Sequence, residues 1–150
     1  MGTHYIGSRK EIRALNAYIK LLRSTQSLGD RIARHQAVPD LNGSQFGALE
    51  ALYHLGPLPQ KTIGEKLLIS KSNVVAIIDA LEERGFVIRR RDLEDRRIIN
   101  VSITQAGRKF VERVFPIHVG TIVDELSCLT AREQDELARL CRKLGLNEQA

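Results

Sequence analysis

Guanidinium groups are concentrated in one short stretch of the chain. Five arginines occur within nine residues: Arg89, Arg90, Arg91, Arg96 and Arg97. The runs 86–88 and 98–103 on either side are rich in β-branched residues, which predicts a β-hairpin with arginine around its tip. Arginine suits a narrow minor groove, because its flat, weakly hydrated guanidinium fits there and meets an enhanced negative potential. The hairpin tip therefore has the chemistry of a DNA contact.

Three acids accompany these arginines, so we expect part of the positive charge to be used within the hairpin. Asp95 is well placed to hold Arg97 through a bidentate pair, which would fix the direction of the guanidinium. Arg96 lies beside it at the tip. Arg89 and Arg90 belong to the ascending strand, where we expect them to meet phosphates or acids.

Two helical signals directly precede the hairpin, over 60–68 and 71–84, and the link between them is short. This spacing predicts a helix-turn-helix, in which the N-terminal residues of the second helix lie nearest the base edges. The N-cap Ser70 and the residues Lys71, Ser72 and Asn73 occupy that end, where backbone N–H groups and the helix dipole favour phosphate. An ordinary helix start has the same composition, so the hairpin is what favours a DNA-binding function.

The elements that must position these groups are mostly helical. Apolar residues at helical spacing predict a long helix over 8–34 and a second helix that stops at 55–57. Thr104 caps a fifth helix to about residue 127, which Pro116 should bend, and Thr130 opens a last helix through Leu144. The expected fold is mainly α with a small β-hairpin wing, in the order α-α-(short β)-α-α-β-β-α-α: a winged helix-turn-helix with long terminal helices.

The terminal helices carry more apolar surface than so small a core can cover. Leu137, Leu140 and Leu144 form one such stripe. A second copy of the chain is the simplest way to bury them, so we expect a symmetric homodimer rather than helices packed only on their own domain. The expected division is a helical dimerisation region, 1–40 and 110–150, around a winged helix-turn-helix DNA-binding domain, 41–109.

Composition supports this interpretation and excludes others. The chain has 150 residues, 43% of them hydrophobic, and a net charge of +5. Residues 58–109 alone carry +4, the electrostatic footprint of a phosphate-backbone ligand. Without a membrane-span or signal-peptide pattern, we expect a cytoplasmic protein that needs no membrane. Histidine and cysteine spacing indicates no metal site, and no nucleotide or hydrolase motif occurs, so we expect neither a cofactor nor catalysis.

Several segments together are similar to one known family. They are 41–46 (LNGSQF), 70–74 (SKSNV), 81–89 (LEERGFVIR), 92–97 (DLEDRR) and 101–107 (VSITQAG). In this order, over about residues 8–146, they resemble the MarR family of bacterial transcription regulators. The resemblance implies a homodimer on double-stranded, pseudo-palindromic operator DNA, usually a repressor released by a small molecule or an oxidant. It also implies that 71–84 is the recognition helix and that Arg97, paired with Asp95, enters the minor groove.

Two departures from the family pattern affect specificity and regulation. Val75 and Ala76 stand where many relatives have Thr and Arg; both can touch thymine methyls, but neither hydrogen-bonds a base. Thiol-based peroxide sensors of the family use a reactive cysteine in the N-terminal helices, whereas the cysteines of this chain are Cys128 and Cys141. A redox switch there stays an alternative to two plain apolar side chains.

Relatives hold their ligands between the DNA-binding block and the dimer helices. The corresponding effector-pocket candidates here are Phe46, Tyr53, His54 and Phe115, and for each of them a plain core role is the favoured alternative. Two other functions stay open: a winged-helix protein-interaction module that has lost specific DNA binding, which Val75 and Ala76 motivate, and a small enzyme or ligand carrier using the interhelical space. A gel shift with DNA upstream of its own gene separates the first of these from a repressor.

Overall fold

The computed structural model describes residues 2–35 and 41–147, and these two ranges belong to two separate compact units. The first unit is built on one helix, α1 (Arg9–Arg34). Its N-cap Ser8 forms a capping box with Glu11: the Ser8 Oγ accepts from the Glu11 N–H at 3.3 Å, and the Ser8 N–H donates to the Glu11 carboxylate at 2.7 Å. No residue of α1 is buried.

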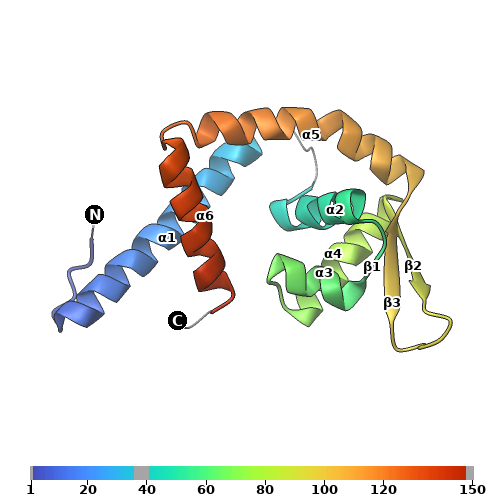
Figure 1. Cartoon of the computed structure of the whole chain (residues 1–150), viewed down its shortest axis with the longest axis horizontal. Coiled ribbons are helices and arrows are strands. Elements are labelled where there is room, and N and C mark those ends of the chain that lie inside the picture. Colours follow the sequence, from blue (N-terminus) through green and yellow to red (C-terminus); the bar gives the residue numbers. More distant parts are fainter. Residues whose placement is uncertain (1, 36–40, 148–150) are drawn as a thin grey trace. The chain divides into compact units, whose positions relative to one another are not determined.

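The second unit contains every other element (Figure 1). In chain order they are α2 (Gly43–Leu55), β1 (Leu58–Pro59), α3 (Gln60–Leu67), α4 (Lys71–Glu83), β2 (Val87–Arg91), β3 (Ile99–Ile103), α5 (Gln105–Glu125) and α6 (Ala131–Gly145). This is the predicted order, and the helix bounds agree with the predicted ones to within one or two residues. The mainly helical class with a small antiparallel sheet is confirmed.

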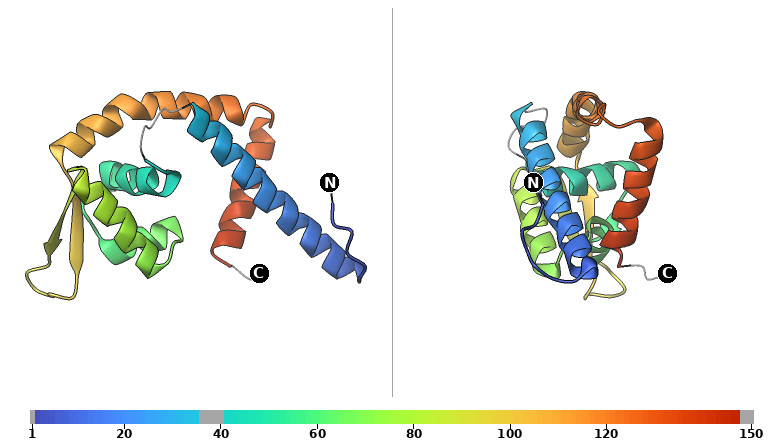
Figure 2. Two further views of the ribbon diagram at one scale, coloured as in Figure 1. Left: turned by 180° about the vertical axis from the view of Figure 1, so that it is seen from behind. Right: turned by 90° about the vertical axis from the view of Figure 1, so that its left-hand side faces the viewer.

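The three strands form one antiparallel sheet in the order β1-β3-β2. The hairpin pairs Val87 with Ile103 and Arg91 with Ile99, and β1 adds two residues to the other edge of β3, with Leu58 opposite Val101. Figure 2 shows the β2–β3 loop extending beyond α3 and α4. Pairing with β1 thus attaches the hairpin to the domain, while the tip of the hairpin remains accessible to a ligand.

A single hydrophobic core holds these elements. Its buried side chains come from α2, α3, α4, β2, β3 and the first half of α5: Phe46, Ala48, Leu49, Leu52, Ile63, Val74, Ile77, Ile78, Leu81, Val87, Val101, Phe110, Val111 and Val114. Among the described residues no charged or polar side chain is buried with them. Because α4 and the hairpin share this core, their relative positions are set by packing.

Helix α5 leaves the core after Val114, curves visibly along its length (Figure 1), and contains Pro116. The expected domain boundary at 109/110 falls inside this continuous helix. Helix α6 begins at a capping box of Thr130 and Glu133, and none of its residues is buried. It ends at Gly145, one residue later than expected, and Asn147 beyond it adopts the left-handed conformation. Within the described ranges, no helix combines the length and apolarity needed to cross a bilayer.

Candidate nucleic-acid interface

The N-terminal end of α4 is exposed and carries hydrogen-bonding groups. Ser70 caps it, with its Oγ accepting from the Asn73 N–H at 3.3 Å. One face of α4 is buried through Val74, Ile77, Ile78 and Leu81. The predicted contacts Lys71, Ser72, Asn73, Val75 and Ala76 are all exposed. The helix therefore presents all five to an incoming ligand.

Two carboxylates organise the wing loop between β2 and β3. Asp92 accepts from the backbone N–H groups of Glu94 (2.9 Å) and Asp95 (3.0 Å) and from the Asn100 side-chain amide (3.1 Å). These bonds, the two backbone ones above all, hold the pKa of Asp92 below its usual value. Hydrogen bonds within the hairpin therefore hold the loop in shape. Apolar packing of Leu93 does not, because its side chain is 93% exposed.

The predicted pair of Asp95 and Arg97 is present in bidentate form. Arg97 Nε donates to Asp95 Oδ1 at 3.0 Å and Arg97 Nη2 to Asp95 Oδ2 at 2.9 Å, and the Arg97 backbone N–H also donates to Oδ1. The Arg97 guanidinium lowers the pKa of Asp95, and Asp95 raises the pKa of Arg97. Since the Arg97 side chain is still 91% exposed, the pair aims the arginine without covering it.

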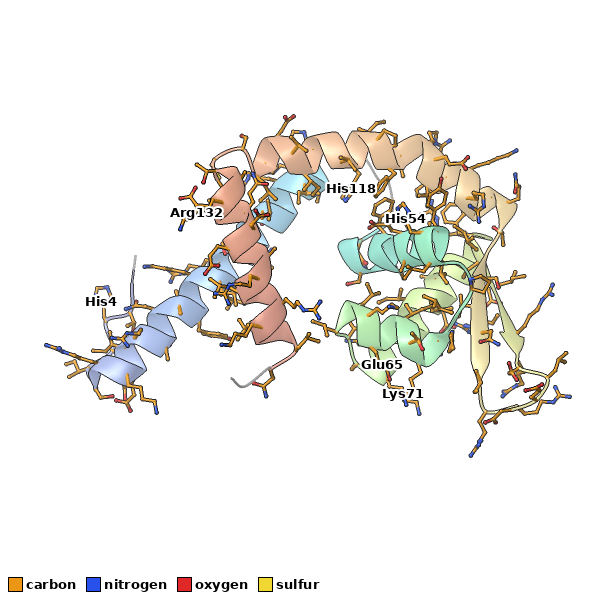
Figure 3. The ribbon with its side chains drawn as sticks, viewed as in Figure 1. His4, His54, Glu65, Lys71, His118 and Arg132 are labelled. Atoms are coloured by element: carbon orange, nitrogen blue, oxygen red, sulfur yellow. The ribbon has the colours of Figure 1, made fainter. Side chains whose placement is uncertain are left out.

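Arg97 and the N-terminus of α4 border the same surface hollow. A depression of about 620 Å³ is lined by Lys61, Lys71 and Arg97 together with residues of α3 and of the turn that follows it. An adjoining one of about 380 Å³ shares these three cations and continues to Ile98 and Ile99. Figure 3 shows Lys71 and Glu65 at the same end of the α3–α4 pair. Lys61 was missed in the sequence, although its position in the first helix of the helix-turn-helix was a usable signal.

The other arginines divide into exposed side chains and one half-buried side chain. Arg90 and Arg96 are exposed, and Arg91 belongs to β2, with its Nη1 donating to the Arg96 carbonyl at 2.9 Å. Arg89 is different: its guanidinium lies against α4 and binds Asp79. The structure thus brings Arg97 together with the α4 N-terminus and turns Arg89 inward.

The four effector-pocket candidates lie together between α2 and α5. Ring centroids are 6.3 Å apart for Phe46 and Phe115, 5.3 Å for His54 and Phe115, and 5.0 Å for Tyr53 and His54. His118, which was not among the candidates, packs edge-on against Phe46 at 4.7 Å. Figure 3 shows His54 and His118 on the facing sides of the two helices. Phe46 is a core residue, 3% exposed, whereas His54 is exposed.

In the described part of the chain no group of three or more His, Cys, Asp or Glu side chains is arranged to hold a metal ion. Cys128 and Cys141 are both exposed and unbridged. The lysines and arginine that line the two hollows make the site a cationic surface between α3, α4 and the hairpin.

Comparison with known proteins places this surface in a family context. Residues 41–99 match the model of the MarR family. The chain is 34% identical to an HTH-type transcriptional regulator of Bacillus subtilis, YkoM, over 91% of this chain and 89% of that protein. Its fold is similar to that of Sco3205, a MarR-family regulator from Streptomyces coelicolor solved with DNA (TM-score 0.82, 20% identity, 99% and 94% of the two chains).

A further solved structure concerns regulation by a small molecule. BpsR of Bordetella bronchiseptica, whose DNA binding is regulated by 6-hydroxynicotinic acid, is 25% identical, with a TM-score of 0.69 over 83% of this chain and 98% of that one. These similar proteins are regulators and not enzymes, and Sco3205 and BpsR are described as binding DNA. From its sequence, its fold and its cationic surface, the chain belongs to the MarR family of transcriptional regulators.

Proposed function

We propose that this regulator is a homodimeric repressor that acts in the cytoplasm, binds a pseudo-palindromic operator and is released by a small-molecule effector. The observation that carries the DNA-binding part is the exposed, bidentate Arg97–Asp95 pair on the same hollow as Lys71. An arginine held in this way meets DNA with its direction already fixed, which lowers the entropy lost on binding.

In this proposal the two DNA-contacting parts have different roles. Ser72 and Asn73 contact base edges or phosphates, Lys71 binds phosphate, and the wing residues Arg90, Arg96 and Arg97 follow the backbone and the minor groove. Val75 and Ala76 contribute only apolar contacts. Much of the affinity then comes from charge and DNA shape, and binding falls steeply with salt.

Homodimerisation is proposed from the helices outside the winged-helix core. Neither α1 nor α6 buries a single residue within its own chain, and α6 leaves Leu137 42%, Leu140 47% and Leu144 63% exposed. Such apolar stripes are characteristic of helices that pack against a partner. A twofold-symmetric dimer also explains why the operator would be pseudo-palindromic. On this proposal, 1–40 and 110–150 form the dimerisation region.

The effector site is proposed at the aromatic cluster of α2 and α5. Tyr53 and Phe115 are half-buried and His54 is exposed, so the cluster offers π faces and imidazole hydrogen-bonding groups at the protein surface. That chemistry suits a small aromatic molecule with polar substituents. Aromatic acids and phenols, with 6-hydroxynicotinic acid as one probe, should raise the melting temperature, and His54→Ala should reduce this shift. If none of these compounds raises the melting temperature, the proposal that the effector binds at this cluster is wrong.

Operator binding is tested by fluorescence anisotropy on DNA upstream of the protein's own gene. We expect Arg97→Ala to weaken binding by about tenfold or more, as loss of an arginine contact does. Arg139→Ala is the matched control, because Arg139 forms an equally bidentate pair with Glu136 on α6, which is outside the proposed DNA interface. Equal affinity of Arg97→Ala and wild type would refute the wing assignment. No DNA binding by the wild type would favour the protein-interaction module.

A further inference from the structure

Arg89 makes contacts that none of the other wing arginines makes. It is the third residue of β2, and its guanidinium reaches across to α4. Its Nη2 donates to the Asp79 carboxylate and to the Val75 carbonyl (3.3 Å), and its Nε lies 3.5 Å from Glu82 Oε2. Only 24% of the side chain is exposed. One side chain thus joins the wing strand to two successive turns of α4.

The acceptors lie on the helix that the proposed function places in the major groove. Asp79 follows Ser72 and Val75 along the exposed side of α4, and its side chain is 57% exposed. A carboxylate there repels DNA phosphates unless a cation compensates it. Arg89 supplies that cation at hydrogen-bond distance. To reach a phosphate instead, it would have to give up its hydrogen bonds to Asp79 and Val75 and its ion pair with Glu82, and leave both carboxylates facing the DNA.

We propose that Arg89 is a positioning residue of the DNA interface and not a DNA contact. It holds the wing strand against α4 and compensates the charge of Asp79, so that helix and wing approach the DNA in a fixed relation. This inference rests on the proposed function, and it assigns Arg89 a different role from the phosphate contact that the sequence suggests. It also separates Arg89 from Arg90, which follows it on β2 and is exposed.

A double-mutant cycle with Asp79→Asn separates the two roles of Arg89. If Arg89 positions and neutralises, Arg89→Gln weakens operator binding about tenfold in the wild type, but by less than about threefold when Asp79 is already Asn, because the uncompensated charge is gone. If Arg89 binds a phosphate, Arg89→Gln costs as much or more in the Asp79→Asn background. That second result would overturn the proposal.

The salt dependence of binding gives an independent readout. Each lost phosphate contact lowers the slope of log K against log salt by about 0.9. We expect Arg89→Gln to leave this slope unchanged. Arg90→Gln is the matched control, since it removes the same charge from the next residue; it should lower the slope and weaken binding equally in both Asp79 backgrounds. A slope reduced equally by Arg89→Gln and Arg90→Gln would contradict the positioning role.

The same cycle on the DNA-free protein keeps a failure of this inference distinct from a failure of the proposed function. In urea unfolding, Arg89→Gln should lower the unfolding midpoint more in the wild type than in Asp79→Asn, whereas Arg90→Gln should show no such difference. Absence of coupling between positions 89 and 79 would overturn the positioning role of Arg89 even if no operator were found. Coupling here without operator binding would refute the proposed function alone.

Discussion

At the scale of single residues, the wing uses its acids to set geometry. Asp92 folds the loop by accepting backbone N–H groups, and Asp95 holds Arg97 in a bidentate pair. Neither carboxylate is buried, so their effect comes from hydrogen bonds in a fixed arrangement and not from a low-dielectric interior. The wing can therefore contain three acids and still present Arg97 to a ligand.

The pKa of Asp95 should report this pair directly. It lies below the ordinary value of 3.8, chiefly because of the Arg97 side chain and secondarily because of the Arg97 backbone N–H. Arg97→Gln should raise it only partly, since the backbone bond persists. The pKa of Asp92, lowered first by backbone N–H groups, should not change. NMR titration of the side-chain carboxyl groups measures both, and an unchanged Asp95 pKa would show that the pair does not form in solution.

The direction of these pKa shifts determines how the contribution of Asp92 and Asp95 to stability depends on pH. A carboxyl whose pKa is lower in the folded protein stabilises the fold above about pH 3.8, the unfolded value, and this contribution is lost as the pH falls through the lowered folded value. The loop contacts of Asp92 and Asp95 should therefore be constant from neutral pH down to about pH 5, and should loosen only in acid below that range. Backbone amide shifts of residues 92–97 would show it.

Specificity at Val75 is also decided at the scale of one side chain. Val75 is 39% exposed on α4 and has no hydrogen-bonding group, so its contribution to base recognition is contact with a thymine methyl. Replacing single thymines by uracil should lower affinity about fourfold at the contacted positions, the effect of one buried methyl group. Val75→Ala should abolish that difference. If every uracil substitution is neutral, α4 gains nothing from thymine methyls.

The Asp95–Arg97 pair was predictable because the two residues are only two positions apart, in a loop whose strands were clear. The inward turn of Arg89 was not. Five arginines look alike in a sequence, and only the packing of β2 on α4 decides which of them meets Asp79. Lys61 was missed for a related reason: its proximity to Arg97 depends on how α3 sits beside the hairpin.

At the scale of elements, the start of α5 is fixed to the start of the hairpin. Thr104 caps α5 by accepting from the Gly107 N–H at 3.1 Å. Its hydroxyl donates to the Gly85 carbonyl at 2.6 Å, and its backbone N–H donates to the Phe86 carbonyl at 2.9 Å. Gly107 lets the first turn of α5 lie directly on the backbone of Phe86, just before β2. This junction accounts for Thr104 and Gly107 in the family-like segment 101–107, and it sets where α5 leaves the domain.

Two buried helical glycines should therefore respond in opposite ways to alanine. A Cβ at Gly107 would overlap the Phe86 carbonyl oxygen and lie 2.9 Å from Ile103 Cγ1, so Gly107→Ala should destabilise the fold by about 1–3 kcal/mol. A Cβ at Gly64 would meet Val74 at 3.5 Å, an ordinary contact, so Gly64→Ala should be neutral or stabilising by up to about 1 kcal/mol. Urea unfolding measures both, and a neutral Gly107→Ala would show that α5 does not pack so closely on Phe86.

Helix bounds were predictable from sequence because their signals are local. Ser8, Ser70, Thr104 and Thr130 each cap the helix that follows, and apolar periodicity marks the helix face. The pairing of β1 with β3 was not predictable, because it joins Leu58 to Val101 across more than 40 residues. A two-residue strand has too little pattern of its own to reveal its partner.

At the scale of the whole molecule, the winged-helix core is complete within one chain, but the terminal helices are not. In the part of the chain that the structure describes, the fourteen buried core residues run from Phe46 to Val114. Beyond them, Ile117 and Val123 on α5 are 58% and 62% exposed, and α6 exposes its leucine stripe. Exposure of this extent is unfavourable in water, which is the physical reason to expect a second copy of the chain.

A charge in the α6 stripe should therefore dissociate the dimer. Leu140→Glu places a carboxylate where the proposed interface buries apolar surface, and such a group must stay solvated. Sedimentation should show a monomer at micromolar concentration. Operator affinity should fall by a factor of about 10² or more, because each half-site must then bind without the other. The far-ultraviolet spectrum should persist, since α6 contributes nothing to the core.

Arg142→Glu is the control for this experiment. It introduces the same residue two positions away on α6, on the side of the helix opposite the leucine stripe, and should leave both the dimer and operator binding intact. A dimeric Leu140→Glu would exclude the α6 stripe as the interface. A monomeric Leu140→Glu that keeps wild-type operator affinity would mean that one winged helix suffices for recognition, and the pseudo-palindromic operator would have to be abandoned.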